Sequence, residues 1–231
     1  MRGWWRELGE LVLPAHCAGC GAPGGVLCGP CRDSLYLPSP VRVDSGRPVP
    51  RLPPVFAAGA YRDALRAVLL AHKERGALPL AGALGAGLAE AIRAEPPGPC
   101  GTWPVAAVPL LLVPVPSARR TVAARGHDPL LRLARSAAGA LRRGGRPVQV
   151  VPALRQRPGV ADQAGLDAEG RSRNLAGALA VRRGAEGLLR GRAVLVVDDL
   201  LATGASLAEA ARVVRTAGGH VRGGAVVSAV L

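Results

Sequence analysis

The chain contains 231 residues, of which 49% are hydrophobic but only 3% aromatic, so leucine, valine and alanine must fill its core. Its length suits one domain of ordinary size with a small appendage, and no apolar run is long enough to span a membrane. The 30 basic and 16 acidic residues give a formal net charge of +14, which attracts nucleic acids, acidic partners or phosphorylated ligands. The arginines form scattered pairs rather than one dense run, so nucleic-acid binding stays open.

Residues 1–14 have the pattern of a short amphipathic helix. The apolar side chains fall on or near one face, and Arg6, Glu7 and Glu10 interrupt the apolar run. A signal peptide does not tolerate such charges in its hydrophobic region, so we expect a cytoplasmic protein.

Two CxxC pairs follow within a short stretch, and their spacing indicates a metal site. Four thiolates suit a closed, tetrahedral, structural Zn²⁺ site, and glycines beside the cysteines suit the tight turns that aim thiolates at one ion. A redox CxxC is the alternative, but two such pairs without a thioredoxin-like context fit it poorly. Residues 1–36 are therefore expected to form a helix and a zinc knuckle. The fifth cysteine, Cys100, lies in a later segment and is assigned no role. The predicted ligands are Cys17, Cys20, Cys28 and Cys31, and the turn residues are Gly19, Gly21 and Gly29.

Residues 37–54 are rich in proline, arginine and serine and are expected to be a linker, and residues 55–231 to be the main domain. From Phe56 the pattern becomes helix-like, and residues 95–102 are expected to form a loop. Apolar residues recur at helical spacing at Leu65, Val68, Leu69 and His72, and again at Leu80, Leu84, Leu88 and Ile92.

The next segment alternates strand and helix patterns. Residues 110–115 and 148–151 are strand-like, and between them Asp128 and Pro129 are suited to begin a helix that ends at Gly144. Strands that alternate with helices predict an α/β fold with a mainly parallel sheet.

The most informative stretch is residues 193–206. A buried strand over 193–197 leads into Asp198 and Asp199, then a small-residue loop, and then a helix expected over 207–217. Backbone amides and the helix dipole at such a loop can hold a phosphate. Neither a Walker A lysine nor a GxGxxG motif is present, and an ordinary turn with an exposed aspartate pair is the alternative. The predicted phosphate-binding residues are Ala202, Thr203, Gly204, Ala205 and Ser206.

This stretch resembles the signature of type I phosphoribosyltransferases that binds phosphoribosyl pyrophosphate (PRPP), with Ala202 in place of the usual first threonine. Further motifs resemble the ComF family of competence-associated, phosphoribosyltransferase-like proteins in the order of that family. They are the cysteine knuckle; Tyr61-Arg62 with Leu65-Arg66 and Lys73-x2-Gly76; Val113-Pro114-Val115-Pro116 with Arg119-Arg120 and Arg125-Gly126; and Gln163-x-Gly165-Leu166 with Arg171-x2-Asn174-Leu175.

The resemblance implies a sheet of the type I phosphoribosyltransferase kind and a Mg²⁺-dependent reaction of PRPP. Asp198 and Asp199 would bind the ribose hydroxyls and favour a positively charged sugar ring. Arg119, Arg120 and Arg125 would neutralise the pyrophosphate, with Lys73 a weaker candidate; a solvated loop is the alternative for these arginines.

Two functions stay open. One is transfer of the phosphoribosyl group to an unidentified nitrogen acceptor. The other, implied by the family, is an accessory protein that binds single-stranded DNA or recombination proteins during DNA uptake. His127-Asp128-Pro129 replaces the family's usual Phe-Asn-Gln, and this departure and Ala202 bear on whether catalysis is retained.

Overall fold

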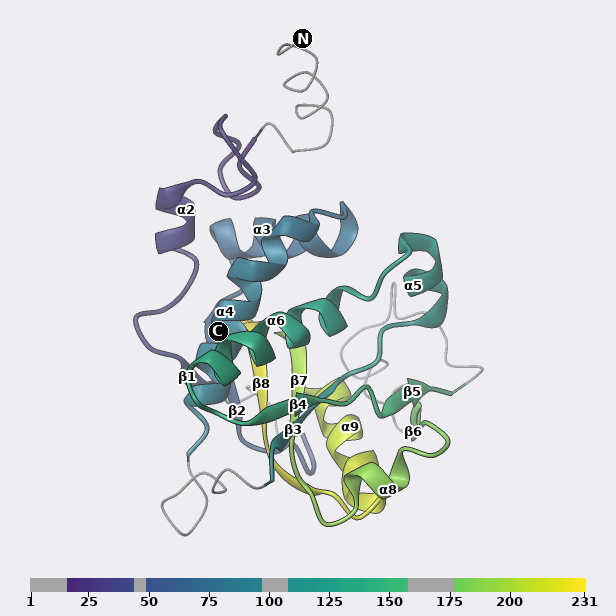
Figure 1. Ribbon diagram of the computed structural model, residues 1–231. Helices are drawn as coiled ribbons and strands as arrows, with labels where there is room; N and C mark the ends of the chain where they lie inside the picture. The colour runs from purple at the N-terminus through teal and green to yellow at the C-terminus, as the bar shows by residue number, and fades with distance from the viewer. Residues whose placement is uncertain (1–15, 44–48, 97–107, 158–176) are drawn as a thin grey trace.

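The computed structural model describes residues 16–43, 49–96, 108–157 and 177–231 (Figure 1). The predicted amphipathic helix, Cys100, and the motif residues Gln163, Arg171 and Asn174 lie outside these residues. Within them, no helix is both long and apolar enough to cross a bilayer.

A six-stranded sheet forms the centre of the molecule, in the order β1-β2-β8-β7-β3-β4. Only β1 is antiparallel to its neighbour, so the prediction of an α/β fold with a mainly parallel sheet is confirmed. The strands are β1 (Val41–Val43), β2 (Val55–Ala60), β3 (Leu110–Pro114), β4 (Val148–Val150), β7 (Ala193–Leu201) and β8 (His220–Ala229). A separate antiparallel pair consists of β5 (Leu154–Gln156) and β6 (Leu179–Val181).

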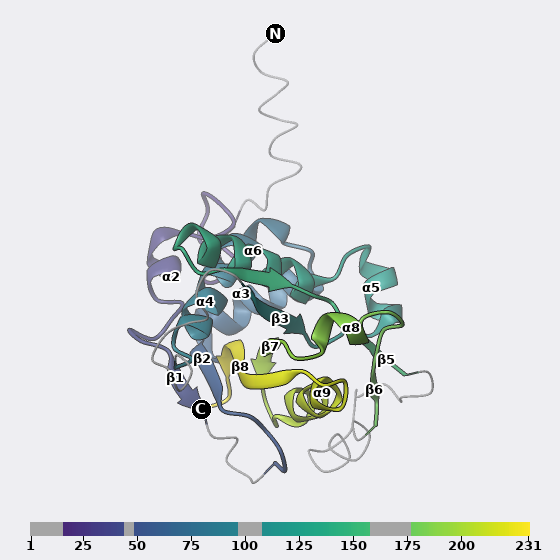
Figure 2. The same ribbon diagram turned by 60° about the horizontal axis from the view of Figure 1, so that its bottom comes forward.

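Helices cover both faces of the sheet, as Figure 2 shows. One face carries α3 (Asp63–Glu74), α4 (Ala81–Arg93) and α6 (Pro129–Arg143), and the other carries α9 (Ala205–Thr216). Shorter elements are α2 (Gly29–Asp33), the 3-10 turn η1 (Leu78–Leu80), α5 (Arg119–Arg125) and α8 (Glu186–Leu189).

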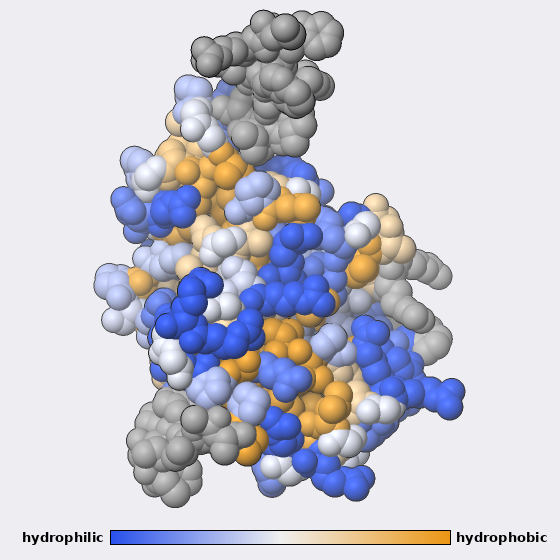
Figure 3. Space-filling view, viewed as in Figure 1, coloured by the Kyte–Doolittle hydropathy of each residue, from blue (hydrophilic) through white to orange (hydrophobic). Residues whose placement is uncertain are grey.

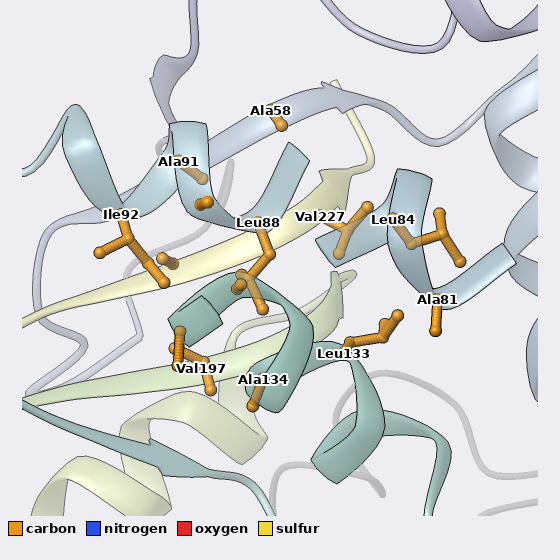
Figure 4. Close-up of a cluster of buried hydrophobic side chains, with 14 of the residues drawn as sticks. Ala58, Ala81, Leu84, Leu88, Ala91, Ile92, Leu133, Ala134, Val197 and Val227 are labelled. Atoms are coloured by element: carbon orange, nitrogen blue, oxygen red, sulfur yellow. The ribbon is translucent and has the colours of Figure 1, made fainter. Parts of the chain in front are cut away.

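Leucine, valine and alanine fill the core, as the composition requires. In Figure 4, Leu84 and Leu88 of α4 and Leu133 of α6 lie over Val197 of β7 and Val227 of β8. The opposite face of α6 carries exposed arginines, including Arg135 and Arg143. Hydrophilic residues on the face shown in Figure 3 alternate with apolar areas and do not form one continuous patch.

The boundaries of α6 follow its sequence signals. Asp128 accepts a hydrogen bond from the backbone N–H of Leu131 at 3.1 Å, and Pro129 occupies the first helical position. The first amide groups of a helix lack intrahelical acceptors. The Asp128 side chain supplies one acceptor, and Pro129 has no N–H group that needs one.

Other boundaries differ from those expected. Residues 55–60 are a strand rather than the start of a helical region: alanine favours helices, but this segment pairs with β8 and is buried there. The segment 37–54 is more than a linker, because it contributes the edge strand β1. Residues 119–125 form a short helix rather than a loop. Strand β7 continues to Leu201 because β8 supplies partners as far as Ala229, and α9 begins at Ala205 rather than Leu207.

The cysteine-rich segment packs onto the main core through the residues that follow it. The Tyr36 hydroxyl donates to the carbonyl oxygen of Ala83 at 2.9 Å, and its ring lies against Gly87 in α4. A Cβ atom on Gly87 would lie 2.3 Å from that ring, so only glycine fits here.

Two glycines of α4 give a matched test of this contact. We expect Gly87→Ala to lower the free energy of unfolding by about 1–3 kcal/mol, because the tyrosine ring must move. Gly82→Ala, on the exposed side of the same helix, meets no atom within 4 Å and should raise it by about 0.5–1 kcal/mol. Urea unfolding of both variants measures the difference, and equal effects would show that the contact does not constrain α4.

Candidate functional site

The four cysteines of the knuckle come together as the sequence predicts. Their sulfur atoms all lie within 4.8 Å of one another, close enough to bind one metal ion. All four are free thiols, and the Sγ atoms of Cys20 and Cys28 are 3.7 Å apart. The backbone N–H groups of Gly19 and Cys28 donate to Cys17 Sγ at 3.4 Å. The donor set is consistent with structural zinc.

Electrostatics within the cluster also fit a cation. Burial raises the pKa of Cys17, but backbone N–H groups from Cys28, Cys20 and Gly19 outweigh it and lower this pKa to about 6. The pKa of Cys31 rises to about 12, chiefly because of the neighbouring sulfurs of Cys20 and Cys28. Four adjacent sulfurs thus resist becoming thiolates together unless a cation compensates their charge.

The three turn glycines have different roles. Gly21 has φ +79°, a left-handed conformation that suits glycine. Gly19 is required for space, because a Cβ atom there would lie 2.8 Å from Cys31 Sγ and 3.3 Å from Ala64 Cβ in α3. Gly29 meets no atom within 4 Å and is free of both constraints.

This contrast makes Gly19 and Gly29 a matched pair. We expect Gly19→Ala to weaken zinc binding by about 10- to 100-fold, because the new methyl group displaces one sulfur ligand. Gly29→Ala should bind zinc like the unsubstituted protein. Competition with a chromophoric chelator measures both affinities, and identical values would show that the cluster does not hold the metal with this geometry.

A second group of polar residues lies at the carboxyl end of β7. Strand β7 lies between β3 and β8, whereas the connection from β3 through α6 leads outward to β4. The chain therefore turns in opposite directions from β3 and β7, and ligands of open α/β sheets bind at such a switch point. Asp198 and Asp199 lie at this edge, and the Asp199 N–H donates to Asp198 Oδ1 at 2.9 Å.

The predicted phosphate loop follows directly. Gly204 has φ +79°, and a Cβ atom there would lie 3.0 Å from Leu52, so glycine suits this position in both conformation and space. The Thr203 hydroxyl accepts from the Ala205 N–H at 3.4 Å, where α9 begins. The first turn of a helix presents amides without intrahelical acceptors, which is the arrangement that binds anions.

The sole lysine of the chain reaches the acid pair. Lys73, at the end of α3, places Nζ 2.8 Å from Asp199 Oδ2. Burial lowers the pKa of Lys73, but the charge of Asp199 and its hydrogen bond prevail, and the net shift is upward. The helical stripe in the sequence predicts α3, but nothing in it indicates that Lys73 contacts Asp199.

The predicted arginines lie on α5, which follows β3. The backbone places Arg119 and Arg120 at the start of this helix; their side chains lie outside the described atoms. Arg125, at its end, forms an ion pair with Glu74 of α3. His127 Nδ1 lies 2.9 Å from the carbonyl oxygen of Arg125. Asp128 and Pro129 begin α6, so two residues of the unusual His127-Asp128-Pro129 segment have structural roles.

Burial, together with the negative charge of Asp199, raises the pKa of Asp198 to about 8. Its neutral form is therefore favoured by folding. That contribution to stability is complete below the unfolded-state pKa near 4 and is lost as the pH rises through the folded-state value.

Asp198→Asn should remove this loss, because asparagine stays neutral and can still accept the Asp199 N–H. We expect equal stability near pH 4 and a gain of roughly 1–3 kcal/mol for the variant above pH 8. Thermal unfolding between pH 4 and pH 9 tests this. Asp199→Asn is the comparison: it removes one cause of the raised Asp198 pKa but leaves Asp198 buried and breaks the Lys73 ion pair, so it should gain less than Asp198→Asn at high pH. A constant difference across the pH range would contradict the assignment.

Neither a protein-family model nor a curated protein sequence matches the chain.

Proposed function

We propose that this chain is a PRPP-binding, phosphoribosyltransferase-like protein of the ComF kind, with a structural zinc ion in its cysteine knuckle. The observation that carries the proposal is the position of Asp198 and Asp199 at the switch point of the sheet. There the acid pair is followed by a glycine turn and the start of α9. The mainly parallel sheet and the two acidic residues near the carboxyl end of β7 support this proposal.

Different groups of residues suit the three parts of PRPP: the 5′-phosphate, the ribose and the pyrophosphate. Backbone amides of residues 202–206 and the Thr203 hydroxyl suit the 5′-phosphate. Asp198 and Asp199 suit the ribose hydroxyls. The arginine-bearing helix α5 follows β3, the strand next to β7, and suits the pyrophosphate.

The reaction needs no protein nucleophile, but it does need groups that stabilise the positive charge on the ribose and the negative charge of the pyrophosphate. The C1–O bond of PRPP breaks and its electron pair leaves with pyrophosphate. A nitrogen of the acceptor donates its lone pair to C1 and then loses a proton. Positive charge develops on the ribose ring in between, and nearby carboxylates stabilise it. Mg²⁺ bound to the pyrophosphate would neutralise the leaving group and usually keeps several waters.

A second role in binding single-stranded DNA is favoured by the charge of +14 and by α6, which contains arginines and no acidic residue. Such binding would weaken steeply with salt. It would use a surface distinct from the acid pair, so the two roles are compatible.

Calorimetric titration of the zinc-loaded protein with PRPP, with and without Mg²⁺, tests the proposed function. We expect Mg²⁺-dependent binding that weakens by roughly 100-fold in the Asp198→Asn/Asp199→Asn variant, because the ribose hydroxyls lose the carboxylate of Asp199 and the carboxyl group of Asp198 as partners. The matched control is Asp33→Asn/Asp63→Asn, which changes two exposed aspartates by the same chemistry. Equal PRPP affinity in both double variants would show that the acid pair does not bind the sugar.

A further inference from the structure

The last two residues of α3 hold opposite charges, and each is paired with a group of the proposed ligand site. Lys73 Nζ lies 2.8 Å from Asp199 Oδ2, and Glu74 forms an ion pair with Arg125 of α5. The Asp199 side chain is only 13% exposed, whereas that of Lys73 is 42% exposed. The carboxylate therefore stays in place within the strand, while the ammonium group has solvent into which it can move.

This arrangement occupies the acceptor that the ribose needs. In the proposed function, Asp199 accepts hydrogen bonds from sugar hydroxyls. In the structure it accepts from an ammonium group, which carries a full positive charge and three donors. A hydroxyl is neutral and a weaker partner for a carboxylate. A sugar phosphate must therefore displace Lys73 before it can use Asp199.

We infer that Lys73 is a positioning residue that selects PRPP over ribose phosphates lacking pyrophosphate. It occupies Asp199 until the pyrophosphate group of PRPP draws it away. Ribose 5-phosphate brings hydroxyls but no second anion, so it competes with the ammonium group for Asp199. PRPP brings both the hydroxyls and the pyrophosphate, so the ammonium group of Lys73 can exchange Asp199 for the pyrophosphate as its anionic partner. The inference rests on the proposed function, because it requires the sugar to bind at the acid pair.

The backbone around Lys73 is held so that only its side chain needs to move. The neighbouring His72 is buried, with Nδ1 and Nε2 each 3.3 Å from a carbonyl oxygen, those of Ala77 and Pro129. The Glu74–Arg125 pair joins the same end of α3 to α5. A lysine suits such an exchange because its charge lies at the end of a flexible four-carbon side chain. An arginine would bind the carboxylate through two parallel hydrogen bonds and would be harder to displace.

The test compares ribose 5-phosphate with magnesium pyrophosphate as calorimetric ligands for Lys73→Met. We expect the variant to bind ribose 5-phosphate about fivefold more tightly, because the competitor is gone, and magnesium pyrophosphate about fivefold more weakly. Arg75→Met is the matched control. It removes one positive charge near the end of the same helix, where the exposed guanidinium contacts the carbonyl oxygen of Ala67. It should change neither affinity.

A second measurement needs no substitution at Lys73. Because the chain has one lysine, protein grown with ¹³C-labelled lysine gives a single side-chain Cε signal in NMR spectra. We expect Asp199→Asn to shift this signal in the ligand-free protein. Saturating PRPP should move the wild-type signal to a new position, because the ammonium has left Asp199.

The outcomes separate this inference from the proposed function. If PRPP binds but the Cε signal does not move, or if Lys73→Met does not tighten ribose 5-phosphate binding, the inference is overturned and the proposed function stands. If wild-type protein does not bind PRPP at all, both are overturned. Opposite changes for the two ligands, together with a moving signal, support the exchange.

Discussion

The site depends on the position of β7. Hydrogen bonding to β3 and β8, with helices over both faces, buries this strand along most of its length. It nevertheless carries two adjacent aspartates, Asp198 and Asp199, near its carboxyl end. Burial and the negative charge of Asp199 disfavour the charged form of Asp198. Two interactions offset this cost: the hydrogen bond from the Asp199 N–H to Asp198, and the ion pair between Lys73 and Asp199. Charge compensation near the end of one strand therefore explains why Lys73 lies against Asp199.

Helix α3 is the element that the two candidate sites share. Near its start, Ala64 lies against the cysteine knuckle close to Gly19, and at its end Lys73 reaches Asp199. Tyr36, which follows the knuckle, is anchored to α4 by its hydroxyl. The knuckle is thus packed against the same layer of helices that carries the lysine. A metal ion bound by the four cysteines would therefore help to hold this layer of helices.

Local signals in the sequence predicted local structure well. The paired cysteines, the Asp128-Pro129 helix start and the strand that leads to Asp198 each depend on neighbouring residues, and all are found. What the sequence could not indicate depends on distant partners. Residues 55–60 contain alanines, which favour helices, and become a strand because β1 and β8 pair with them. The Lys73–Asp199 contact likewise joins segments far apart in the chain, and no periodicity encodes it.

Strand β2 pairs along its length with β8, so an early segment of the chain and the last strand lie side by side in the sheet. Such pairing has a high loop-closure cost and slows folding. During synthesis, residues 55–60 have no parallel partner until residues 220–229 have left the ribosome. Helices α3 and α4, which follow β2, therefore have no complete sheet to pack on until then. The apolar faces of these helices therefore stay without their packing partner until β8 has been synthesised, and exposed apolar surface of this kind favours aggregation of a folding chain.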